Sequence, residues 1–282
     1  MTQYENEVKK RDVMCCMNAG NQGCGRKWSR MRIITDTGTD ILDKEAKKLG
    51  IELVAIRSNF TDTVFSENTE AEFTRFYDKL RQTDTLPVSS QPSPAEFLEL
   101  FEDAKEKQEE VVVITISSKL SGTYNGAMLA KDMAEYDNIY VVDSLQASLS
   151  ERLLVEYAVK LRDAGMGAKE LVRKLEQDRE RVILTGVPST LLYLKMGGRI
   201  SPVVAAVGGV IGIKPVLWLK DGVIESRSKA RGMRMAKSGM QSFLKDYEAD
   251  PAMPVMFAHS DNAEMGQQFM EETVQQFGLT GC

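Results

Sequence analysis

The sequence alternates between short apolar runs and amphipathic stretches of helical length, and this alternation limits the possible folds more than any other feature. Apolar residues at a spacing of about 3.6 indicate helices, and short β-branched runs bounded by turn residues indicate strands. When the two alternate, the usual result is a parallel sheet covered by helices, so we predict an N-terminal Rossmann-like α/β domain with a mainly parallel sheet. The expected strands are residues 31–35, 51–56, 111–116 and 139–142, and the expected helices are 41–49, 125–136 and 147–164.

Two further helices are predicted from their N-terminal capping signals. Thr69 with Glu72, and Ser93 with Glu96, have the spacing of a capping box. Pro94 follows at the first helical position, where its missing N–H costs nothing. Apolar residues repeat at helical spacing after both caps, so we expect both helices to pack against a sheet.

The second half of the chain has a different pattern. Asp221 and Gly222 separate strand-like runs at 215–219 and 223–226, and Asp-Gly in this position is a strong hairpin signal. The other expected elements are helices over 168–180, 230–245 and 262–277, a short helix ending at Gly197 and Gly198, and strands over 182–187 and 255–258. We predict a disordered extension over 1–30, the N-terminal α/β domain over 31–165 and a C-terminal α+β domain with a largely antiparallel sheet over 166–282.

Composition and missing motifs argue against several classes of function. The 282 residues carry a formal net charge of −5, whereas a nucleic-acid surface needs clustered Lys and Arg. The usual nucleotide, hydrolase and metal-binding motifs are absent, and His259 is the single histidine. We therefore expect no catalytic residue, no metal, no cofactor and no nucleic-acid partner.

The sequence also favours a cytoplasmic location. Residues 1–30 lack the apolar segment of a secretion signal, and the four cysteines, Cys15, Cys16, Cys24 and Cys282, form no disulfide or zinc pattern. The longest apolar run, residues 202–213, is shorter than the ~20 residues that a membrane helix needs. We predict a chain without a transmembrane segment in a reducing cytosol.

Two serine-rich segments, residues 87–93 and 117–123, each lead into a predicted helix, and the second directly follows the strand at 111–116. Exposed N–H groups and the positive end of a helix dipole attract a carboxylate or phosphate. In an open α/β sheet, ligands bind beyond the carboxyl ends of the strands. The segments therefore predict an anion site, although these residue types also serve as ordinary turn and capping residues.

Other polar residues have competing interpretations. Asp36 and Asp40 follow the first strand and could shape the crevice, but we favour Asp40 as the cap of a helix that begins at Ile41. Arg199 could contact a ligand, a partner or a surface carboxylate. His259 is interpreted as a structural histidine at a strand end, and the basic residues of 226–237 as a helix face or a docking patch.

Six segments, taken together and in order, identify a resemblance. They are Asp36-Thr37-Gly38-Thr39-Asp40, Ser89-Ser90-Gln91-Pro92-Ser93, Ser117-Ser118-Lys119-Leu120-Ser121-Gly122-Thr123-Tyr124, Val142-Asp143-Ser144, Leu194-Lys195-Met196-Gly197-Gly198-Arg199-Ile200-Ser201 and Ile213-Lys214-Pro215-Val216-Leu217. Over about residues 31–276 the chain resembles the DegV family of bacterial lipid-binding proteins. The resemblance implies a two-domain fold that holds one long-chain fatty acid in a tunnel between the domains. It also implies a noncatalytic carrier that presents the fatty-acid carboxylate to a separate fatty acid kinase, which makes an acyl phosphate.

The resemblance further implies which residues meet the ligand. The family's threonine before Ser-Gln-Pro falls on Ser89, and the serine of its Leu-Ser-Gly-Thr motif falls on Ser121, where the following glycine lets the ligand approach the backbone. The predicted ligand-binding residues are Ser89, Ser90, Ser121, Gly122, Thr123 and Arg199. The family's final strand and His-Thr-Gly-Pro-Gly type motif are not reached, and His259 does not align with that histidine. We expect a chain shortened at its C-terminal end and preceded by an added segment.

The acyl chain needs an apolar lining, for which the glycine-rich run supplies candidates, with ordinary core packing as the alternative. These candidates are Val203, Val204, Val207, Val210 and Ile211. Two other functions stay open: a phosphotransfer enzyme related to dihydroxyacetone-type kinases, and a regulatory module whose ligand state is read by a protein partner.

Overall fold

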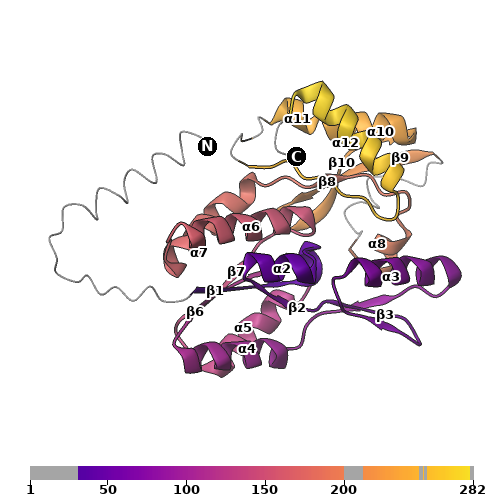
Figure 1. The fold of residues 1–282 in the computed structure, drawn as a ribbon. Coiled ribbons are helices and arrows are strands. Elements are labelled where there is room, and N and C mark those ends of the chain that lie inside the picture. The colour runs from indigo at the N-terminus through magenta and orange to yellow at the C-terminus, as the bar shows by residue number, and fades with distance from the viewer. Residues whose placement is uncertain (1–30, 200–211, 248–249, 251–252, 280–282) are drawn as a thin grey trace, which may run out of the picture. The chain divides into compact units, whose positions relative to one another are not determined.

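Four parallel strands form the central sheet in the order β2-β1-β6-β7 (Figure 1). The computed structural model describes residues 31–199, 212–247, 250 and 253–279. β1 (Met31–Asp36) pairs with β2 (Glu52–Val54) on one side and with β6 (Glu110–Thr115) on the other, and β7 (Ile139–Asp143) pairs with β6. The strand order reverses between β1 and β6, so the topological switch point lies beyond their carboxyl ends.

Helices cover both faces of this sheet. α4 (Pro94–Lys107) and α5 (Thr123–Ala134) pack on one face, where Phe97 and Phe101 meet Ile34. α2 (Asp43–Leu49), α6 (Leu149–Asp163) and α7 (Ala168–Asp178) pack on the other, where Leu154 meets Ile33. Neighbours such as Ile33 and Ile34 serve opposite cores because successive strand residues face opposite sides of the sheet. The predicted α/β architecture is confirmed.

A second, smaller sheet was not predicted. β3 (Arg57–Asn59) pairs antiparallel with both β4 (Val64–Phe65) and β5 (Val88–Ser90). α3 (Glu70–Gln82) packs on it through Phe76, whose ring centre lies 5.5 Å from that of Phe65 and 5.9 Å from that of Phe60. These strands are too short for an apolar alternation to show in the sequence, yet β5 carries Ser89 and Ser90.

The capping signals are confirmed in full at α4 and in part at α3. The Ser93 N–H donates to Glu96 Oε2 at 2.9 Å, and Arg57 of β3 donates to both oxygens of the same carboxylate. The hydrogen bonds from Arg57 are the largest cause that lowers the pKa of Glu96, to about 2. At α3, Thr69 accepts from the Glu72 N–H at 3.1 Å, but the Glu72 carboxylate turns to the Ser66 N–H.

The expected role of Asp40 is wrong. The helix begins at Asp43 rather than Ile41, and Leu42 occupies its cap position. Asp40 instead adopts a left-handed conformation (φ 58°) that closes the short 3-10 helix η1 (Thr37–Thr39), and its carboxylate accepts from the Ser148 hydroxyl. Asp36 caps the other end of η1 by accepting from the Gly38 N–H at 2.9 Å.

The C-terminal part contains an antiparallel sheet in the order β10-β9-β8. β9 (Ile213–Lys220) and β10 (Val223–Arg231) form the predicted hairpin around Asp221 and Gly222, and β8 (Thr185–Gly186) pairs with β9. The remaining elements are the 3-10 helix η2 (Arg179–Arg181), α8 (Leu192–Met196), α10 (Gly232–Gln241), α11 (Phe243–Asp246) and α12 (Ala263–Phe277). The largely antiparallel character predicted for this half is confirmed.

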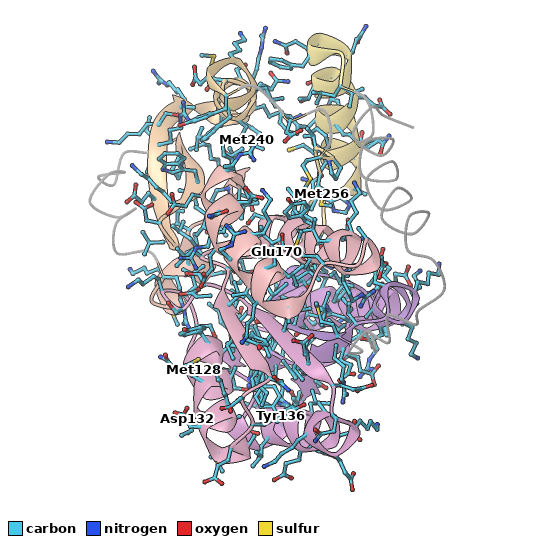
Figure 2. All side chains as sticks on the ribbon, turned by 90° about the vertical axis from the view of Figure 1, so that its left-hand side faces the viewer. Met128, Asp132, Tyr136, Glu170, Met240 and Met256 are labelled. Atoms are coloured by element: carbon cyan, nitrogen blue, oxygen red, sulfur yellow. The ribbon has the colours of Figure 1, made fainter. Side chains whose placement is uncertain are left out.

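The predicted strand over 255–258 is wrong, because residues 254–259 pair with no strand in the described part of the chain. Figure 2 labels Met256, which belongs to this segment, and Met240 of α10. It also labels Met128 and Asp132 of α5.

The contact pattern groups residues 31–282 in one compact unit. The predicted domain boundary between residues 165 and 166 stays a prediction, and the extension over 1–30 lies outside the described residues.

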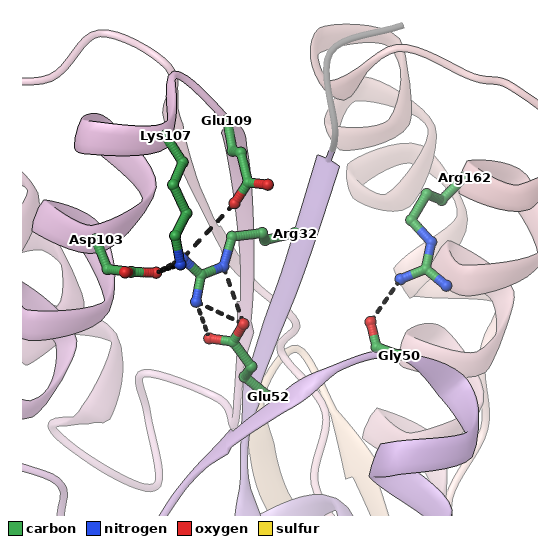
Figure 3. Close-up of polar contacts among 7 residues, drawn as sticks. All are labelled: Arg32, Gly50, Glu52, Asp103, Lys107, Glu109 and Arg162. Carbon is green, nitrogen blue, oxygen red and sulfur yellow. Dashed lines mark hydrogen bonds and ion pairs between the residues drawn. The ribbon is translucent and has the colours of Figure 1, made fainter.

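A charged cluster at the amino end of β1 is structural (Figure 3). Arg32 pairs with Glu52 of β2 and with Asp103 of α4, each at 2.6 Å, and Glu109 lies 3.8 Å away. On the other side, Arg162 donates to the Gly50 carbonyl at 2.8 Å. These contacts fasten helices to the sheet at the end opposite to the switch point.

Candidate functional site

The segment between β6 and α5 is held in place by side chains from neighbouring strand ends. Asp36 Oδ2 accepts from the Ile116 N–H at 2.8 Å, and Asp143 Oδ1 accepts from the Ser118 N–H at 3.0 Å. The Ser117 hydroxyl donates to the Gly222 carbonyl in the β9–β10 turn at 2.7 Å. The predicted anion loop therefore sits at the switch point, with the hairpin tip docked on it.

Ser121 and Thr123 form the start of α5. Their hydroxyls lie 2.8 Å apart, and Ser121 Oγ accepts from the Thr123 N–H at 3.3 Å, which forms a serine turn just before the helix. Thr123 is fully buried, whereas Ser121 is partly exposed. Ser121 is therefore the hydroxyl that a ligand can reach, and the buried Thr123 hydroxyl holds it in place through their hydrogen bond.

Arg199 reaches this segment from the turn that follows α8. Its Nε donates to the Leu120 carbonyl at 2.9 Å, and its guanidinium also contacts the Gly197 carbonyl. Gly198 has a φ of +73°, which glycine adopts without strain. This turn brings a cation next to the start of α5.

These segments border an open cleft of about 350 Å³, near the lower end of the range of small-molecule sites. Its lining consists of Ser118–Gly122, Gly197–Arg199, and Val223 and Ile224 of β10. Lys119 and Arg199 are the charged residues among them, and no carboxylate is included. Together with the N-terminus of α5, the two cations favour an anionic ligand.

Ser89 and Ser90 do not line this cleft, but the residue that follows them contacts Gly122 at its edge. They alternate along β5, and Ser90 Oγ accepts from Asn59 Nδ2 at 3.0 Å. Gln91, the next residue, packs against Gly122 at the start of α5. The structure thus connects both serine-rich segments, although the contact runs through a residue that was not among the predicted site residues.

Two buried carboxyl groups lie beneath the β6–α5 segment. Asp36 and Glu151 are both inaccessible to solvent, and burial raises the pKa of Asp36 to about 7. Burial, and next the charge of Asp36, raises the pKa of Glu151 well above its usual value. In the described chain no hydrogen bond of normal geometry reaches either Glu151 oxygen, although the Thr35 hydroxyl faces it. An uncharged Glu151 is the form that this environment favours.

Other predicted candidates lie elsewhere. His259 is exposed, and its Nδ1 accepts from the Asn262 N–H at 3.2 Å near the start of α12. Arg227, one of the basic residues considered for docking, lies 3.8 Å from the ring centre of Phe243 and pairs with Asp246. The five apolar tunnel candidates and all four cysteines lie outside the described residues.

Within the described ranges, no cluster of His, Cys, Asp or Glu has the arrangement of a metal site. In the same residues, no helix is long and apolar enough to cross a membrane.

Comparison with known proteins identifies the family. Residues 30–280 match the family model described as "Uncharacterised protein, DegV family". The chain belongs to the DegV family. A DegV domain-containing protein from Caldanaerobacter subterraneus is 31% identical over 236 residues, which cover 83% of this chain and 84% of that protein.

Solved structures of family members have the same fold. A stearic-acid-binding protein from Eubacterium ventriosum superimposes with a TM-score of 0.78 at 26% identity, covering 89% of this chain and 88% of that one. The Streptococcus pneumoniae fatty acid kinase B3 protein, solved with linoleic acid, gives 0.75 at 27% identity, covering 88% and 89%. These DegV relatives are fatty-acid-binding proteins.

Proposed function

We propose that this chain binds a long-chain fatty acid, with the carboxylate at the cleft formed by residues 118–122 and the Arg199 turn. It presents that carboxylate to a partner fatty acid kinase and performs no chemistry of its own. The proposed setting is the bacterial cytoplasm. The observation that carries the proposal is the cleft itself, which joins a helix N-terminus to two cations in a family whose solved members hold fatty acids.

The polar groups at the cleft can orient the ligand but do not account for tight binding. A hydrogen bond to an ionised group contributes about 1.5–3 kcal/mol. Burying roughly sixteen methylenes at ~0.8 kcal/mol each supplies about 12 kcal/mol before the costs of binding are subtracted. Affinity is therefore expected to come mainly from the acyl tail, and the position of the carboxylate from the cleft.

Ser121 is the residue that tests the head-group position. Ser121→Ala is expected to weaken palmitic acid binding about tenfold, because a hydrogen bond to the carboxylate is lost. The measurement is isothermal titration of delipidated protein. Ser121→Thr keeps the hydroxyl and should restore binding, and Ser66→Ala serves as a matched control outside the cleft. Undiminished affinity in Ser121→Ala would place the head group elsewhere.

The carrier role is tested separately from binding. The isolated chain with ATP and palmitic acid is expected to form no ADP, whereas addition of a bacterial fatty acid kinase should yield acyl phosphate. ATP turnover by the isolated chain would instead support the phosphotransfer enzyme. If the chain binds palmitic acid but the kinase transfers no phosphoryl group to it, the result would favour a regulatory module whose ligand state is recognised by another protein.

A further inference from the structure

The space above Gly122 is occupied by a side chain of the protein. A Cβ at Gly122 would lie 2.1 Å from Gln91 Oε1, 2.9 Å from its Cδ and 3.0 Å from its Nε2. The Gln91 carboxamide therefore rests directly on the Gly122 backbone. No side chain larger than hydrogen fits at residue 122 unless Gln91 moves away.

The backbone of Gly122 does not itself require glycine. Its φ of −79° and ψ of 6° are open to other residues, unlike the left-handed conformations that favour glycine. Glycine at this position permits the close approach of Gln91. The expectation that Gly122 admits the ligand to the backbone stays a prediction, but the structure shows that Gln91 fills this position.

The contact continues along α5. Pro92 is buried, and its carbonyl oxygen lies 3.6 Å from the place where a Cβ on Gly126 would be. Gly122 and Gly126 are four residues apart, so they present one face of the helix to the segment that leaves β5. Gln91 and Pro92 thus place the end of β5, which carries Ser89 and Ser90, against the first turn of α5.

The carboxamide of Gln91 also has hydrogen-bonding capacity to spare. Gln91 is exposed, and no residue in the described part of the chain hydrogen-bonds to its side chain. A glutamine amide supplies two N–H donors as well as an acceptor oxygen. Gln91 Nε2 lies 3.0 Å from the Cβ position of Gly122 and 3.8 Å from that of Gly126, so these donors lie beside the first turn of α5. The helix dipole attracts a carboxylate to this end of the helix.

We propose that Gln91, seated on Gly122, is a ligand-binding residue that donates a hydrogen bond to the fatty-acid carboxylate and fixes the spacing of the two serine-rich segments. This inference rests on the proposed function, because it takes a carboxylate as the ligand. Gly122 contributes by leaving room for Gln91 to approach the start of α5.

The test is a double-mutant cycle on delipidated full-length protein, with palmitic acid and its methyl ester as the two probes. Gln91→Ala is expected to lower the affinity for the acid about tenfold and to leave that for the ester nearly unchanged, because the ester carries no charge. Gly122→Ala should cause a similar loss by displacing Gln91. The double variant should be no weaker than either single variant, since the methyl group then occupies the space that Gln91 has left. Gln82→Ala, an exposed glutamine at the end of α3, is the matched control.

Three results would overturn the inference in a protein that binds palmitic acid: unchanged affinity in Gln91→Ala, equal losses for acid and ester, or losses that multiply in the double variant. If the wild-type chain binds no fatty acid, the proposed function fails instead. A crystal structure of Gly122→Ala still tests the contact in that case. The Gln91 carboxamide should lie away from residue 122, because the end of this exposed side chain can move at little cost. A carboxamide in its original position would contradict the contact.

Discussion

At the scale of single residues, the most unusual groups are the carboxyls of Asp36 and Glu151. Both lie within 3.4 Å of the point where a Cβ on Gly38 would be, so this glycine lets them approach each other. Asp36 accepts two backbone N–H groups, which favour its charged form, whereas Glu151 has no such partner among the described residues. Asp40 and Asp143 add like charge around Glu151, so protonation relieves repulsion.

The chain is expected to be more stable at pH 5 than at pH 8. Asp36 has a pKa raised from 3.8 to about 7, so the stability linked to its protonated form is complete below pH ~4 and lost as the pH rises through ~7. The loss from Asp36 should be on the order of 3 kcal/mol. Glu151, whose pKa is also raised by burial and by the charge of Asp36, adds to the loss in the same direction. Glu96, whose pKa is lowered, stays ionised between pH 5 and pH 8, so it does not make the free energy of unfolding change with pH in this range.

Urea denaturation at pH 5, 6, 7 and 8 measures this effect. Asp36→Asn should reduce the slope of the profile, at the cost of one backbone hydrogen bond, because an amide cannot ionise. The slope that remains should come from Glu151, which burial still affects. Glu151→Gln should fold normally at pH 7, since it replaces an uncharged carboxyl by an amide of similar shape. Equal stability at pH 5 and pH 8 in the wild type would contradict the assignment.

At the scale of elements, the β9–β10 hairpin and the β6–α5 segment are fastened at one point. Gly222 has a φ of +81°, and a Cβ there would lie 2.6 Å from Ser117 Oγ and 3.0 Å from a methyl group of Leu145. The next two residues of the hairpin, Val223 and Ile224, form one wall of the cleft. The position of that wall therefore depends on the close contact of Gly222 with Ser117.

Gly222→Ala is expected to lower both stability and fatty-acid affinity. The positive φ costs roughly 1–2 kcal/mol for a residue with a Cβ, and the overlap with Ser117 must displace the hairpin. Gly278→Ala is the matched control, because Gly278 also has a positive φ (+61°) but no atom lies within 4 Å of its Cβ position. Calorimetric melting and palmitic acid titration should show a larger loss for Gly222→Ala. Equal effects would mean that the hairpin contact adds nothing beyond backbone strain.

At the scale of the whole molecule, the cleft is made by segments that are distant in sequence. The β6–α5 segment, the turn at Gly197–Arg199 and the start of β10 each supply part of its lining. A ligand that contacts all of them binds the folded chain and not the unfolded one. Binding must therefore stabilise the fold.

Removal of the ligand should lower the melting temperature. At a palmitic acid concentration one hundred times the dissociation constant, the stabilisation should be about 2.7 kcal/mol. Thermal unfolding of delipidated protein with and without palmitic acid measures it, and hexadecane, which has no carboxylate, provides the comparison. Identical melting curves with and without the acid would contradict the proposed site.

The order of helices and strands in the first half could be predicted because each element carries its own periodic pattern. Ile33, Ile34, Val112 and Val113 are fully buried strand residues, as their apolar runs indicated. By contrast, β3, β4 and β5 have two or three residues each and no pattern of their own. At residues 255–258 the sequence predicted a strand that the structure does not contain. Strand-like composition alone is insufficient, because a strand also needs a neighbouring strand to pair with.

The sequence by itself determined the alternation of elements, the hairpin at Asp221 and Gly222, the family resemblance and the serine-rich segments. These features are local, so capping, turn geometry and periodicity are sufficient to reveal them. Only the tertiary structure decided that Gln91 rests on Gly122, that Thr123 is buried beneath Ser121, and that Asp36 and Glu151 meet near Gly38. Such contacts depend on how far apart two distant backbones come to lie, and no local pattern in the chain encodes that distance.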